Sequence, residues 1–217
     1  RLDAVRLALK SFHVMEAQEG ETERQRMAQA LTLASQSVKA DPKEAYAHFA
    51  LARVHFVADQ CAIGRRHTIH ATEANPYDPV ILSILGNFSA MCGDESGMAM
   101  VERAYAHRSP GESYARLSLV LAAVRDNDTE RLQALRDDPD GLGGTKAAYH
   151  HLCETLIAAG LGDIAAARAN WRKFEASPHI EQGSDDALLR SIIMSAEIRG
   201  RVLAFLRRKG VLDAPER

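Results

Sequence analysis

The chain has 217 residues, of which 46% are hydrophobic and 26% are charged, and its formal net charge is −2. This content is enough for a continuous core in one or two domains. The near balance of charge gives no basic face of the kind that nucleic-acid binding requires. Apolar runs such as 80–82 are too short to cross a bilayer, and no secretion-signal pattern starts the chain. We therefore expect a cytoplasmic protein that contacts neither membrane nor nucleic acid.

Helical signals dominate the chain from its first residues onward. Aromatic residues make up only 6% of the sequence, and no Asn-Gly or Asp-Gly turn separates alternating segments, so strand signals are scarce. Apolar and small residues instead recur at helical spacing, as in Met98, Val101, Ala104 and Tyr105. These patterns predict an all-α fold.

Three prolines mark a repeat within this helical chain. Pro42, Pro76 and Pro110 each follow a helix-like run and lie 34 residues apart (76 − 42 = 34 and 110 − 76 = 34). Proline cannot continue the hydrogen-bond ladder of a helix and restricts the residue before it, so each proline marks the end of a unit. A period of this length is typical of paired helices that stack into an α-α superhelix.

The period divides residues 1–178 into helix-pair units. The expected units are about 11–44, 45–78, 79–112, 113–144 and 145–178. We assign three residues of the third unit to specific tasks: Gly86 allows the two helices to approach closely, Gly93 adopts a positive φ, and Asp94 caps the next helix. The sequence GLGD before residue 164 predicts the same kind of turn in the fifth unit.

Residues 179–217 are predicted to form a C-terminal capping helix or helix pair. Ser184 is the expected N-cap, two aspartates follow it, and Arg207, Arg208 and Lys209 precede Gly210, which suits the helix dipole at both ends. We expect Gly200 to divide this segment into two helices. A repeat array needs such a cap because its last unit otherwise exposes an apolar face.

Together these units resemble the tetratricopeptide repeat. The layout is similar to the C-terminal repeat region of bacterial signalling proteins that begin with a nucleotide cyclase or a winged-helix DNA-binding domain. The resemblance rests on the stretches VKADPKEAYAHFALARVHF, ANPYDP, AHRSPGESYARLSLVLAAVRDND and LAFLRRKGVLDAPE. It implies a non-enzymatic scaffold for protein–protein interaction, which serves as the regulatory or assembly region of a larger signalling protein. An effector domain is then expected before Arg1.

In tetratricopeptide proteins the first helix of each unit lines the inner face. Carried over to this chain, the inner-face positions form what we call the predicted stripe: Tyr46, Phe49, Arg53, Phe56, Val80, Ser83, Asn87, Tyr114 and Leu117. Its first four members are spaced by 3, 4 and 3 residues, which is one helical face. Aromatic rings beside an arginine suit a peptide or helix in a groove, or the effector domain of the same chain. Packing of Tyr46 and Phe56 against neighbouring helices is the alternative.

The histidines allow a second class of function. His67, His70 and Glu73 lie three residues apart on a helix, which gives the alternative of a metal-dependent helical enzyme, although no H-E-x-x-H motif is present. We expect His48 and His55 to be core residues.

Two adjacent histidines at positions 150 and 151 cannot both face one way on a helix, so one is expected to pack and one to be solvated.

No nucleophile elbow or glycine-rich phosphate loop is present, so we expect no catalytic residue, metal or cofactor. The three cysteines, Cys61, Cys92 and Cys153, form no C-x-x-C pair and are expected to be small buried thiols in a reducing compartment. A nucleic-acid-binding helical repeat is a further alternative, and pairing of the end units into a homo-oligomer stays open.

Overall fold

The structure of the chain is a computed structural model that describes residues 2–16, 22–107, 112–138, 147–178, 180–190, 192–193 and 195–213. Within these ranges it contains twelve α-helices and no β-strand, so the prediction of an all-α fold is confirmed. None of the helices in the described ranges is both long and apolar enough to cross a membrane.

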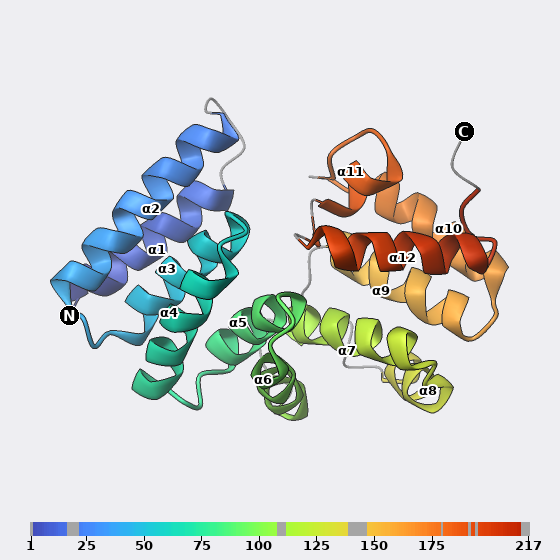
Figure 1. Cartoon of the computed structure of the whole chain (residues 1–217), viewed down its shortest axis with the longest axis horizontal. Helices are drawn as coiled ribbons and strands as arrows, with labels where there is room; N and C mark the ends of the chain where they lie inside the picture. The colour runs from blue at the N-terminus through green and yellow to red at the C-terminus, as the bar shows by residue number, and fades with distance from the viewer. Residues whose placement is uncertain are drawn as a thin grey trace.

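The helices form successive pairs that follow an arc, from α1–α4 through α5–α8 to α9–α12 (Figure 1). The first helix of each pair contacts the first helix of the next pair, as expected for an α-α superhelix. The five pairs are α1 (Leu2–Glu16) with α2 (Glu23–Ala40), α3 (Ala45–Val57) with α4 (Cys61–Ala74), α5 (Pro79–Met91) with α6 (Glu95–Ala106), α7 (Glu112–Asp126) with α8 (Thr129–Arg136), and α9 (Ala147–Gly160) with α10 (Ile164–Glu175). Two further helices follow, α11 (Asp185–Arg190) and α12 (Ala196–Arg208).

Prolines stand just after the second helix of a pair. Helix α2 ends at Ala40 and α4 at Ala74, and in both cases a proline follows two residues later. The predicted role of Pro42 and Pro76 as boundary residues is therefore confirmed, whereas Pro110 lies outside the described residues. The unit boundaries themselves remain an interpretation, because the first pair already starts at Leu2.

The turns inside four of the pairs share one backbone feature, a left-handed residue. The four residues are Asp59 (φ 57°), Gly93 (φ 75°), Asn127 (φ 56°) and Gly162 (φ 86°). They are separated by 34, 34 and 35 residues (93 − 59, 127 − 93 and 162 − 127), so the repeat is present in the backbone as well as in the sequence. In the last three turns an aspartate follows, and its side chain accepts a backbone N–H of the next helix. The predictions for Gly93 and Asp94 are confirmed.

Replacing Asp59 by glycine should stabilise the protein. A left-handed backbone strains a residue with a Cβ, while glycine adopts it freely but loses more entropy on folding. The gain should be about 0.5 kcal/mol, which corresponds to a rise in Tm of about 1 to 2 °C for a chain of this size. Differential scanning calorimetry measures it. The reciprocal control is Gly93→Asp, which should lower Tm; a lower Tm for Asp59→Gly would contradict the assignment.

Helices α5 and α6 approach each other most closely at two glycines. A Cβ added to Gly86 would lie 2.9 Å from the Cβ of Met100, and one added to Gly97 would lie 2.4 Å from the backbone nitrogen of Ala90. Both distances are too short for real atoms, so the helices can only pack this way because no side chain separates them. The predicted role of Gly86 is confirmed, and Gly97 is its partner on the second helix.

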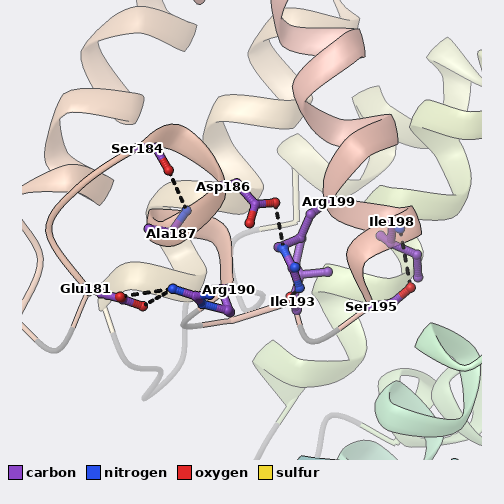
Figure 2. A network of polar contacts seen from close by, with 9 residues as sticks. All are labelled: Glu181, Ser184, Asp186, Ala187, Arg190, Ile193, Ser195, Ile198 and Arg199. Atoms are coloured by element: carbon purple, nitrogen blue, oxygen red, sulfur yellow. Dashed lines mark hydrogen bonds and ion pairs between the residues drawn. The ribbon is translucent and has the colours of Figure 1, made fainter.

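A polar network joins α11 to α12 at the C-terminal end of the array (Figure 2). The guanidinium of Arg199 donates to the Asp186 carboxylate (2.9 Å) and to the carbonyl of Ile193 (2.9 Å), and only 8% of this residue is exposed. Arg190 donates twice to the Glu181 carboxylate at 3.0 Å. Arg199 thus holds the short helix α11 against the start of α12.

The ends of these two helices differ in part from the prediction. The Ser184 hydroxyl accepts the Ala187 N–H (3.3 Å), so the expected N-cap is confirmed. The break between the helices, however, falls between Arg190 and Ala196, and Ser195 caps the second helix by accepting the N–H of Ile198. Gly200 lies inside α12, so its predicted role as the dividing residue is wrong; a single glycine costs a helix too little to end it.

Two of the three cysteines form a disulfide, which corrects the prediction of reduced thiols. Cys61 at the start of α4 is bonded to Cys92 at the end of α5, with their Cα atoms 6.0 Å apart. Stacking of successive units brings these two turns together, and local spacing rules cannot detect such a pair. Cys153 alone is a free, buried thiol, and burial raises its pKa to about 12.

Candidate protein-binding site

The predicted stripe divides into a buried part and a half-buried part. The buried residues, each at most 2% exposed, are Phe49, Phe56, Ser83, Asn87 and Leu117. The half-buried residues are Tyr46, Arg53, Val80 and Tyr114. A rigid partner can therefore reach only the second group without rearrangement of the helices.

The buried residues lie where successive first helices pack on each other. The ring of Phe56 on α3 stacks on Phe88 of α5, with ring centroids 5.6 Å apart. The Ser118 hydroxyl of α7 donates to the side-chain oxygen of Asn87 on α5 at 2.7 Å. The alternative of helix packing thus applies to Phe56, and the serine–asparagine bond adds a specific link between units.

Phe49 is also part of the core, because two other aromatic rings cover it. Its ring centroid lies 4.8 Å from that of Phe12 on α1 and 5.7 Å from that of Tyr46, which it meets edge to face. The guanidinium of Arg53 lies 5.2 Å from the centroid of the same Phe12 ring. This cation–π contact orients Arg53 beside the aromatic cluster.

Tyr46 is fixed at the junction of two units. Its hydroxyl donates to the Asp78 carboxylate at 3.1 Å, and the other oxygen of that carboxylate caps α5 by accepting the N–H groups of Val80 and Ile81. Burial, together with the charge of Asp78, raises the pKa of Tyr46 to about 12. The phenol therefore remains a neutral hydrogen-bond donor at physiological pH.

Tyr114 has a partner that the sequence reasoning missed. Its ring meets that of Tyr149 on α9 edge to face, with centroids 4.8 Å apart, and Tyr149 is only 8% exposed. Burial raises the pKa of Tyr149 well above its usual range. The two tyrosines are 35 residues apart (149 − 114), so the repeat period could have paired them. Tyr46 and Tyr114 are thus held in place by residues of the next unit, whereas Arg53 contacts Phe12 of the preceding one.

Of the two histidines expected in the core, one is there. His48 is 6% exposed, which confirms its prediction. His55 is only half-buried, and its Nδ1 lies 2.7 Å from the Gln60 side-chain oxygen, so the prediction for His55 is wrong. His55 lies two turns after His48, where α3 approaches its end and packing covers less of each side chain.

The adjacent histidines of α9 behave alike, against the prediction. His150 and His151 are both half-buried, and neither Nδ1 atom has a hydrogen-bond partner among the described residues. Burial lowers the pKa of both side chains. The two rings lie beside each other, with centroids 5.3 Å apart, which sequence periodicity alone does not reveal.

The alternative metal site is not formed. Among the residues that the structure describes, no group of three or more histidine, cysteine, aspartate or glutamate side chains is arranged to hold a metal ion. His70 and Glu73 approach only to 3.8 Å at the surface. The spacing of His67, His70 and Glu73 along one helix does not make their ligand atoms converge.

A second concave surface, which the sequence did not predict, lies at the C-terminal end. A cleft of about 870 Å³ is bounded by α10, the start of α11 and the end of α12. Trp171 and Leu203 are among its apolar lining residues, and Arg207, which pairs with Asp185 at 2.9 Å, is among the charged ones. Its mixed lining is suited to a polar ligand or a peptide, in addition to the predicted stripe.

Stacked helix pairs with a repeating left-handed turn define the class: an α-α superhelix of the tetratricopeptide type. Solved structures share this fold. The chain aligns with PilW, described as a widely conserved type IV pilus biogenesis factor, over 94% of its own length and 91% of that chain (TM-score 0.62, 15% identity). It also aligns with PilF of Pseudomonas aeruginosa (94% and 89%, TM-score 0.57, 16% identity) and with TTC0263, a thermophilic TPR protein of Thermus thermophilus (94% and 98%, TM-score 0.55, 14% identity).

Comparisons of the sequence itself find no matching family model and no matching curated protein. Identities of this size show the fold alone. The three descriptions name no cyclase or winged-helix regulator, so the expected likeness to such signalling proteins gains no support from them.

Proposed function

We propose that this chain is a non-enzymatic scaffold that binds a protein partner along the half-buried part of the predicted stripe. The observation that carries the proposal is the fixed arrangement of Tyr46, Arg53 and Tyr114, each held by an aromatic or carboxylate neighbour. Rings and a guanidinium that are already ordered lose little entropy when a partner binds. The partner is expected to present an apolar segment with a nearby carboxylate for Arg53.

A charge reversal at Arg53 tests this proposal. Arg53→Glu should reduce capture of the partner from a lysate at least about tenfold, since an attractive contact becomes a repulsive one. The matched control is Arg24→Glu, the same change at an exposed position of α2. Quantitative mass spectrometry after affinity capture gives the ratio, and circular dichroism verifies that both variants keep their helices. Equal capture by both variants would refute binding through the stripe.

Two finer roles fit such a scaffold. The sequence resemblance favours a regulatory or assembly region of a cytoplasmic signalling protein. The Cys61–Cys92 disulfide instead favours an assembly scaffold in an oxidising compartment, because disulfides persist there and are rare in the cytoplasm. One of the structurally similar proteins, PilW, is described as a type IV pilus biogenesis factor, which is compatible with an assembly role.

The redox state of the two cysteines in cells distinguishes these roles. If the scaffold works in an oxidising compartment, Cys61 and Cys92 should resist alkylation by maleimide until a reductant is added, after acid quenching and denaturation. Cys153 is the internal control, because it has no disulfide partner and should label once the protein is denatured. Complete labelling of all three without reductant would favour the cytoplasmic role.

A further inference from the structure

Four histidine rings gather between α3 and α4. His48 and His55 come from α3, and His67 and His70 come from α4. The ring centroids lie 4.9 Å apart for His48 and His70, 5.3 Å for His48 and His67, and 5.8 Å for His55 and His67. These rings form part of the contact between the two helices of the pair.

One hydrogen bond at the centre of this cluster depends on protonation. The Nε2 of His48 lies 2.8 Å from the Pro42 carbonyl, which can only accept, so this nitrogen carries a proton. The Nδ1 of a neutral His48 is then an acceptor, and it lies 3.0 Å from the Nδ1 of His67. His67 must therefore donate through Nδ1. The contact between the two neutral rings thus holds a single hydrogen, which His67 supplies.

The surroundings of His67 oppose an added positive charge. It faces His48 and His55 on α3 and has His70 and Arg66 beside it on α4, and burial together with these groups lowers its pKa to about 4. Helix α5, which also contacts α4, has no titratable side chain. Of the remaining charged or phenolic groups of α3, Arg53 lies over Phe12 and Tyr46 bonds to Asp78. The neighbouring groups that act on the pKa of His67 thus all oppose its positive charge.

We propose that this histidine cluster is a proton-operated latch, which holds α3 against α4 at neutral pH and releases it in acid. When both central rings are fully protonated, an N–H group of His67 faces an N–H group of His48 and the bond between them is lost. Because the unfolded or opened chain binds more protons than the closed one between pH 6.5 and 4, stability falls as the pH drops through this range. Above about pH 6.5 the contribution of His67 to stability does not change with pH.

The latch would regulate the surface that the proposed function uses, since Tyr46 and Arg53 are on α3. Release of α3 changes their positions relative to α5 and α7 and thereby weakens binding in acid. The inference about the latch itself does not depend on the proposed function, because opening of the helix pair is measured in the absence of any partner.

Hydrogen exchange with mass spectrometry tests the latch on the whole chain at about pH 7 and about pH 5. After correction for intrinsic exchange rates, protection of α3–α4 should fall about tenfold at the lower pH, while α7–α8, which contain no histidine, serve as the internal reference. At pH 5 a pKa lowered from 6.5 to about 4 corresponds to a factor of about thirty, and the half-exposed position of His67 reduces this factor. Unchanged protection of α3–α4 at the lower pH would overturn the proposal.

Two variants show whether His67 is responsible. His67→Gln retains a donor toward His48 but cannot be charged, so the loss of protection in acid should disappear. His13→Gln, at an exposed position of α1, should keep the wild-type response. Persistence of the full acid response in His67→Gln would overturn the proposal. If this variant does not fold, nitrogen NMR of the wild-type rings decides, since a charged His67 at about pH 7 would contradict the latch.

Discussion

Replacing Gly97 by alanine is expected to destabilise the protein by about 3 kcal/mol, close to the upper end for an overpacked position. The added Cβ would lie 2.4 Å from the nitrogen of Ala90 and 2.8 Å from the carbonyl oxygen of Gly86, and both are backbone atoms that cannot rotate away. Helices α5 and α6 would have to separate. Urea unfolding at equilibrium measures the loss as a shift of the midpoint at constant slope.

Gly200→Ala is the matched control for this substitution. Gly200 also lies inside a helix, but a Cβ added there meets no atom within 4 Å. Alanine should therefore stabilise α12 by about 0.5 to 1 kcal/mol through its higher helix propensity. If Gly97→Ala lowers the free energy of unfolding and Gly200→Ala raises it, the close approach of α5 and α6, and not the loss of a glycine, causes the effect. Stabilisation by Gly97→Ala would contradict the packing of these helices.

Replacing Arg116 by methionine is expected to cost about 3 kcal/mol, for an electrostatic reason. Arg116 is only 2% exposed, and its guanidinium donates to the carbonyl of Leu135 (2.8 Å) and to the carboxylate of Glu154 (2.9 Å). It thereby joins α7, α8 and α9. Removal of the charge leaves a carboxylate of low exposure without its partner, and such losses typically cost about 3 to 5 kcal/mol. Thermal or urea unfolding of the variant measures the cost.

Two comparisons separate the buried ion pair from other effects of this change. Arg131→Met breaks the exposed pair between Arg131 and Glu102 and should cost less than about 1 kcal/mol. The double variant Arg116→Met, Glu154→Leu removes both buried partners and should recover part of the loss. If the double variant loses as much free energy of unfolding as the two single variants lose together, the unpaired carboxylate is not the origin of the cost.

The sequence predicted best what depends on local chemistry and on the repeat. The positive φ of Gly93 and the N-caps at Asp94 and Ser184 follow from residue type and position, and the structure has all three. Gly86 was also placed correctly, because a small residue in an apolar helix indicates a close contact. Each of these features depends on residues close together in the chain or on the position of a residue within the 34-residue repeat.

The features that the sequence did not predict depend on how tightly successive units stack. Periodicity shows which side of α3 is apolar, but the burial of Phe49 and Asn87 is set by Phe12 and Ser118, which come from other helices. The Cys61–Cys92 disulfide has the same origin, since it joins turns of two different units. A helical stripe therefore predicts an inner face, but not how much of this face remains open to a partner.

Site-specific photocrosslinking in cells tests the central claim most directly. A photoreactive amino acid would replace Arg53 or Tyr114 on the proposed binding face, and Ile69 on α4, whose side chain is 55% exposed, as the reference position. If the chain is a scaffold that binds through its first helices, positions 53 and 114 should cross-link to one and the same protein, and position 69 should not. Cross-links to that protein from position 69 alone would contradict the proposed site and place binding on another face.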